Sequence, residues 1–179
     1  MENKIELKAT GETITFITTS KDSKGEFVEV ITILPADGEG PPLHRHVLQT
    51  ELFEAIEGRL GLDCGDKKII LEPGQSFTVP ANTPHRCYSV DGDVIKFKGV
   101  FTPPLSIEYF LTEMFEACNR TGTKDPTTFD GCYILRQVKD EYLLEDPAIF
   151  VQQTLFPFIA IIGKTFGQIK AKSKSAFIV

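Results

Sequence analysis

The 179-residue sequence has no excess of positive charge and no glycine-rich phosphate-binding loop. Its formal net charge is -6 at pH 7, and its isoelectric point is near 5.1. Because a protein neutralises nucleic-acid phosphates with a basic face, this charge excludes nucleic-acid binding as the main task. Because this loop is absent, the sequence lacks the usual signature of nucleotide binding.

Cysteine is scarce and widely spaced. Among the four cysteines no pair has the spacing of a zinc site or a redox motif; they are Cys64, Cys87, Cys118 and Cys132. The first residues, MENKIELKATGETI, carry charges but lack the apolar core of a secretory signal. We therefore expect a cytoplasmic protein whose cysteines are reduced thiols.

The sequence also lacks an apolar run long enough to suggest a membrane span. Residues 155–162 are apolar but are interrupted by Pro157, and a spanning helix needs about 20 such residues. Four lysines follow this run: Lys164, Lys170, Lys172 and Lys174. We expect the segment to pack on the rest of the chain or on a second subunit. Peripheral contact with an anionic membrane and a lid over a binding site are the alternatives.

Histidine is rare, but it is concentrated in one pattern. All three histidines lie in two short segments, residues 38–58 and 74–89. The first segment runs Gly38, His44, His46, Glu51, Gly58, and the second runs Gly74, Pro80, Asn82, His85. Side chains alternate faces along a strand, so His44 and His46 point the same way and Arg45 points the other way. Three imidazoles and the Glu51 carboxylate, coming from different strands, can therefore converge inside a closed sheet.

This set of side chains has the character of a metal site. Imidazole nitrogens and a carboxylate oxygen suit a divalent transition metal, and four ligands leave one or two positions open for water, dioxygen or substrate. Fe(II) is our first choice and Mn(II) the second, with Ni, Zn, Co and Cu as further candidates. A closed structural zinc site fits less well, because such sites favour cysteine. A degenerate site that keeps these residues but holds metal weakly is the alternative.

The two segments together resemble the cupin superfamily, whose two signatures carry two His and a Glu and then a third His. The resemblance covers residues 30–101 and does not reach the last third of the chain. It departs from the family pattern at Asn82, where glycine is common, but Asn tolerates positive φ better than other non-glycine residues. The resemblance implies His44, His46, Glu51 and His85 as metal ligands in a jelly-roll barrel.

The pattern of the first hundred residues agrees with that fold. Short segments rich in Thr, Val, Ile and Phe alternate with Gly, Pro, Asp and Asn; they are residues 13–19, 27–34, 51–62, 67–71, 76–80, 85–90 and 94–101. With the resemblance, they predict a mainly β fold, a double-stranded β-helix (the jelly-roll cupin barrel), over residues 1–104.

Residues 105–179 are predicted as a helical extension that packs on the barrel or on a second subunit. Apolar residues recur at helical spacing in residues 105–122, and Gly122 ends the pattern. Residues 125–146 predict a second helix that starts at Asp125-Pro126 and includes Tyr142. The resemblance and the apolar third segment together lead us to expect a homodimer.

Strand parity also predicts what surrounds the metal ligands. We expect an apolar substrate pocket formed by Phe53, Ala55, Gln75, Phe77, Cys87 and Phe97. Gln75 and Arg86 are the nearest polar side chains, and strand parity directs Arg86 outward. The alternative for each aromatic residue is that it packs in the barrel core and does not line a pocket. We interpret Cys87 as a small core residue rather than a reactive thiol.

These features leave two classes of function open. The first is a metal-dependent oxygenase of a small apolar or aromatic substrate, in which Glu51 is catalytic because it loosens from the metal and accepts a proton. The second is a binding or sensing protein that holds a small molecule without turnover. A metal-dependent isomerase is a further alternative, but an apolar pocket offers few groups to hold sugar hydroxyls.

Overall fold

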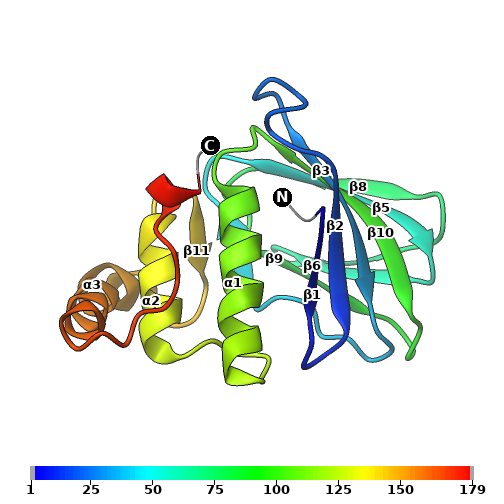
Figure 1. Cartoon of the computed structure of the whole chain (residues 1–179). Helices are drawn as coiled ribbons and strands as arrows, with labels where there is room; N and C mark the ends of the chain where they lie inside the picture. Colours follow the sequence, from blue (N-terminus) through cyan, green and yellow to red (C-terminus); the bar gives the residue numbers. More distant parts are fainter. Residues whose placement is uncertain (1–2, 178–179) are drawn as a thin grey trace.

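The computed structural model describes residues 3–177, which form two antiparallel sheets accompanied by three α-helices (Figure 1). In spatial order, the first sheet contains β1 (Lys4–Leu7), β2 (Glu12–Thr18), β3 (Val28–Leu34), β10 (Ile95–Thr102), β5 (Thr50–Glu57) and β8 (Ser76–Val79). The second contains β11 (Tyr142–Leu144), β4 (His44–His46), β9 (His85–Ser89), β6 (Leu60–Cys64) and β7 (Lys67–Leu71).

The strands alternate buried and exposed side chains, which sets the register of each sheet. In β10, Ile95, Phe97 and Phe101 are buried, whereas Lys96 and Lys98 lie on the other face and pair with acidic residues of β5. One core cluster joins the inner faces of the two sheets through residues such as Phe53 and Leu62. A second cluster lies between β1–β3 and the helices.

The predicted mainly β, jelly-roll architecture is confirmed. Each of the seven predicted segments contains a strand, and residues 51–62 divide at Gly58, whose φ of 72° reverses the chain between β5 and β6. Within residues 3–177 the hydrogen-bonded ladders form two separate sheets, so the expected closed barrel is instead an open sandwich. The sequence pattern did not predict β1 at the edge of the first sheet.

The first predicted helix is confirmed as α1 (Ile107–Thr121), which ends where Gly122 takes a left-handed conformation with φ of 72°. The second, α2 (Thr128–Gln137), begins after Thr127, whose hydroxyl accepts the Asp130 N–H, and not at the predicted Asp125-Pro126. The prediction that this helix includes Tyr142 is wrong, because Tyr142 belongs to β11. A tight turn after Val138 redirects the chain, and pairing with β4 overrides the local helical spacing.

The third helix, α3 (Ile149–Thr165), packs on α2, and Gly163 allows the close approach of Phe129. In Figure 1, α1 runs beside the sandwich and α2 and α3 lie beyond it. A short 3-10 turn, η1 (Lys174–Ala176), follows. Within residues 3–177, no helix has the length and apolarity needed to cross a membrane. The boundary at residue 104 between the barrel and the helical extension stays a prediction. Residues 1–2 and 178–179, at the outer ends of these two predicted domains, lie outside the described residues.

Candidate metal centre

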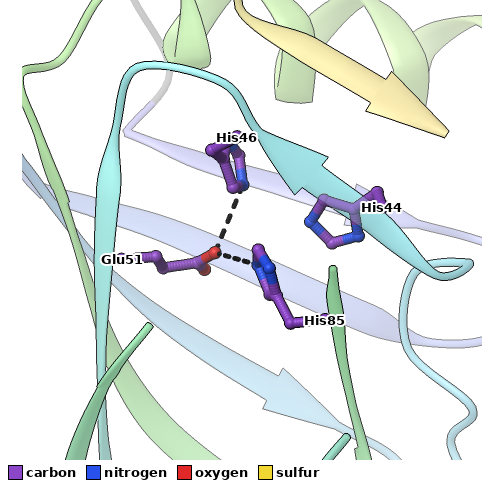
Figure 2. Close-up of side chains that lie close together, drawn as sticks. All are labelled: His44, His46, Glu51 and His85. Atoms are coloured by element: carbon purple, nitrogen blue, oxygen red, sulfur yellow. Dashed lines mark hydrogen bonds and ion pairs between the residues drawn. The ribbon is translucent and has the colours of Figure 1, made fainter. Parts of the chain in front are cut away.

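The four predicted ligands lie together, although they come from three strands of both sheets. His44 and His46 are on β4, Glu51 is on β5, and His85 is on β9, where it pairs in register with His44. One ligand atom from each residue lies within 4.8 Å of the others, and all four side chains are buried. Figure 2 shows them pointing toward one another. The arrangement is one that could hold a metal ion.

Glu51 contacts two of the three histidines of this cluster. Its Oε2 lies 3.0 Å from His85 Nε2 and 3.2 Å from His46 Nε2, and both contacts are drawn in Figure 2. Burial acts to raise the pKa of Glu51, but the hydrogen bonds from His46 and His85 outweigh it and hold that pKa below its usual range. Glu51 is therefore a carboxylate that needs nearby positive charge.

In each of the three histidines, Nδ1 lies within hydrogen-bond distance of a backbone carbonyl or side-chain amide oxygen. His44 Nδ1 is 2.8 Å from the Pro42 carbonyl, and His85 Nδ1 is 2.8 Å from the Thr83 carbonyl. His46 Nδ1 is 3.0 Å from Gln49 Oε1. Because a carbonyl oxygen only accepts, each Nδ1 donates, and in the neutral imidazole Nε2 then carries a lone pair.

Gln49 is oriented by its own hydrogen bonds. Its Nε2 donates to the carbonyls of Pro103 (2.8 Å) and Pro104 (2.7 Å), which directs Oε1 toward His46. The spacing of the histidine motif did not single out this residue. Its place between His46 and Glu51 was the one signal in the sequence that could have pointed to it.

The residues fit a cation at the centre of the cluster. Burial and the neighbouring His46 and His85 hold the pKa of His44 well below its ordinary value, so its imidazole is neutral. Burial acts to lower the pKa of His85, but its hydrogen bond to Glu51 raises it. Neutral Nε2 lone pairs and a carboxylate oxygen that face one another need either protons or a metal ion between them.

A cavity of about 720 Å³ opens from this cluster. It lies between the sandwich and α1, and His44, His46 and Glu51 contribute to its wall. Most of the surrounding side chains are apolar, and they include Phe101, Phe110, Leu111, Met114 and Phe115. Its size falls within the range of about 300–1,000 Å³ that is usual for small-molecule sites.

The six predicted pocket residues lie in three different environments: the cavity wall, the core between the sheets and the exposed surface. Phe53, Cys87 and Phe97 line the cavity. Ala55 is buried in the core between the sheets, and Phe77 packs against that core from β8. Gln75 is exposed, and its side-chain oxygen accepts the N–H of Glu72. Contact of any of these residues with a substrate stays a prediction.

Cys87 lies on the cavity wall but does not have the environment of a reactive thiol. It is buried and free of any disulfide. Burial raises the pKa of its thiol well above the ordinary value, and the carboxylates of Glu51 and Glu12 raise it further. A thiol held in its neutral form agrees with the interpretation of Cys87 as a core residue.

Tyr142 is a wall residue that the sequence did not reveal. Its ring stacks on His44 with 4.7 Å between centroids, and it packs on Phe110 at 4.2 Å. The residue reaches this position because β11 pairs with β4, with Tyr142 opposite His46. No local pattern marks this pairing, because the two strands are almost a hundred residues apart.

An antiparallel jelly roll in which three histidines and a glutamate converge beside a cavity defines a class of β proteins with a candidate metal centre. Comparison with known proteins agrees with this class, because residues 30–100 match the model of the cupin domain. The chain therefore contains a cupin domain over these residues.

Curated relatives share parts of this chain. Quercetin 2,3-dioxygenase of Bacillus subtilis (strain 168) is 33% identical over 96 residues, which are 54% of this chain and 28% of that protein. Oxidoreductase OpS7 of Beauveria bassiana (strain ARSEF 2860) is 42% identical over 55 residues, 30% of this chain and 18% of that protein. The matches therefore span less than a third of either relative.

Solved structures resemble about half of the chain. A predicted oxalate decarboxylase of Thermotoga maritima has a TM-score of 0.49 and 13% identity, over 51% of this chain and 80% of that one.

Proposed function

We propose that this protein is a metal-dependent oxygenase that acts on a small apolar or aromatic substrate. Its divalent metal, with Fe(II) as first choice and Mn(II) as second, would be held by His44, His46, Glu51 and His85. The observation that carries the proposal is the convergence of four buried ligand atoms at a mostly apolar cavity. The similarity to a quercetin dioxygenase over half of the chain supports the choice of oxygen chemistry.

The residues of the site would have separate roles in the reaction. A bound metal would supply an electrophilic centre with open positions for dioxygen and substrate. Glu51, the one carboxylate in the cluster, would accept a proton from the substrate as its catalytic residue. Phe53, Phe97 and Tyr142 would exclude water and hold an aromatic ring beside the ligands.

The alternatives differ in what they require of the cavity. A binding or sensing protein would use the same apolar walls and the same metal but would not consume oxygen. An isomerase of a polyhydroxylated substrate would need several polar side chains beside the metal, and the wall next to the ligands is formed by Phe53, Phe101, Phe110 and Tyr142. We therefore rank the isomerase below the other two functions.

Oxygen uptake tests the proposal. The protein, loaded anaerobically with Fe(II) or Mn(II), is mixed with air-saturated buffer and a panel of phenols and other aromatic compounds that begins with quercetin. We expect substrate-dependent oxygen consumption that falls at least about 100-fold in Glu51→Gln. Glu54→Gln is the matched control, because Glu54 lies on the same strand but pairs with Lys98 on the outer face. Binding of panel compounds without any oxygen uptake would leave the non-catalytic alternative in its place.

A further inference from the structure

The cavity contains a second carboxylate, away from the histidine cluster. Glu12 lines it from β2, where Glu12, Ile14 and Phe16 share the inward face because side chains alternate along a strand. Its neighbours across β1 and β3 in the cavity wall are apolar, such as Leu7 and Leu34. A glutamate at an inward position of an apolar strand face needs a reason, since burying a lone carboxylate is costly.

Glu12 has no charged or hydrogen-bonding partner among the residues that the structure describes. Within residues 3–177, its carboxylate forms neither an ion pair nor a hydrogen bond with another residue. The two basic residues of the cavity wall are already engaged: Lys124 contacts Glu39 at 3.1 Å, and Arg86 contacts Asp63 at 2.9 Å. Burial raises the pKa of Glu12 to about 7, which reflects a charge that nothing nearby offsets.

The cavity as a whole favours positive charge. Five acidic side chains line it against two basic ones; the acidic residues are Glu12, Asp37, Glu39, Glu51 and Asp125, and the basic ones are Arg86 and Lys124. Aromatic rings, including Phe101, Phe110 and Phe115, provide π faces that attract a cation and bury an apolar body.

We propose that Glu12 is a specificity-determining residue that binds the ammonium group of an arylalkyl or other apolar amine whose body lies along the cavity wall. This assignment rests on the proposed function in one respect, because it takes the cavity to be the substrate site. Glu12 and Glu51 line the same cavity, together with His44 and His46. An amine bound at Glu12 can therefore place its other end toward the metal ligands.

Binding to the metal-free protein tests the assignment without depending on turnover. Phenethylamine and tryptamine, with 2-phenylethanol and tryptophol as neutral counterparts, are titrated calorimetrically at about pH 8, where Glu12 is ionised and the amines are protonated. We expect the wild type to bind each amine at least about tenfold more tightly than its alcohol, which is the preference that a charged hydrogen bond confers. Glu12→Gln should lose this preference.

The control variant is Glu29→Gln, which removes a carboxylate from the outward side of β3, between the buried Val28 and Val30. It should keep the wild-type preference for amines. Equal affinity for amines and alcohols in the wild type, no binding of either, or a preference that persists in Glu12→Gln would overturn the assignment. Metal content is measured on the same variants. Loss of amine preference with full metal content isolates Glu12, whereas amine binding by a protein that never takes up metal contradicts the oxygenase and leaves the amine site standing.

Discussion

Gln49 shows how a single side chain can position a metal ligand from outside the ligand set. It accepts a hydrogen bond from His46 Nδ1 while it donates to the carbonyls of Pro103 and Pro104 at the end of β10. Such partners fix the orientation of a ligating imidazole and increase its basicity. Gln49 therefore links the first sheet to a ligand on the second.

Replacing Gln49 by Leu should weaken metal binding by about 10- to 100-fold, because His46 loses the acceptor that orients it. The free energy of unfolding should fall by about 1–3 kcal/mol, since the two proline carbonyls lose their buried donor. Competition with a chromogenic chelator measures the first effect, and urea unfolding of the metal-free protein measures the second. Gln75→Leu is the control, because the side chain of the exposed Gln75 hydrogen-bonds the backbone of Glu72 rather than a metal ligand. Wild-type metal affinity in Gln49→Leu would contradict this role.

At the scale of single residues, spacing and the family resemblance together predicted which four side chains converge. His44 and His46 are two apart on one strand, so their shared direction follows from strand geometry, and the resemblance supplied Glu51 and His85. The hydrogen-bond acceptors that orient the ligand imidazoles were not predictable in the same way. The carbonyls of Pro42 and Thr83 are backbone atoms, and their positions depend on the path of loops rather than on residue type.

The element that most affects the site is the three-residue strand β11. It adds to the edge of the second sheet by pairing with β4, and it places Tyr142 on the His44 ring. Arg45, on the outward side of β4, strengthens this junction through a two-pronged contact with Glu145, at 2.6 and 2.9 Å. The C-terminal third of the chain thereby forms one wall of the centre.

Tyr142→Ala should lower the free energy of unfolding by about 3–5 kcal/mol, since it removes a buried ring between His44 and Phe110 and leaves a void. Tyr142→Phe should cost less than about 1 kcal/mol, because within residues 3–177 the hydroxyl makes no hydrogen bond to another side chain or backbone group. Denaturant unfolding of the two variants compares these effects. Equal destabilisation by both substitutions would show that the hydroxyl, and not the stacked ring, is what matters.

Element prediction succeeded where the sequence pattern was local. The alternation in residues 27–34 and 94–101 gave β3 and β10, and Gly122 correctly marked the end of α1. It failed for residues 138–146, because the preference of Tyr142 for strand comes from a partner strand far away in the sequence. Long-range pairing of this kind leaves no periodic signal in a short segment.

At the scale of the whole molecule, the sandwich and the helices share the cavity. The sheets contribute Glu12, Phe53 and the ligand cluster, and α1 contributes the opposite wall with Phe110 and Phe115. The cupin match ends at residue 100, before α1 begins. The part of the cavity wall that α1 forms therefore lies outside the matched domain.

The outer face of α3 is apolar and exposed. Its exposed apolar side chains include Phe150, Phe158 and Ile161. The homodimer and the cytoplasmic location stay predictions. The sequence suggested a partner for this segment, and within the chain it packs on α2 with part of its apolar surface still exposed.

Metal content shows directly whether His44, His46, Glu51 and His85 hold an ion. Elemental analysis by mass spectrometry is made on the purified protein and on a His44→Ala, His85→Ala double variant, with Glu54→Gln as the control outside the cluster. We expect about one iron or manganese ion per chain in the wild type and control, and none in the double variant. If the wild type holds no metal even after anaerobic reconstitution, the metal centre is contradicted, and an apolar ligand-binding sandwich remains.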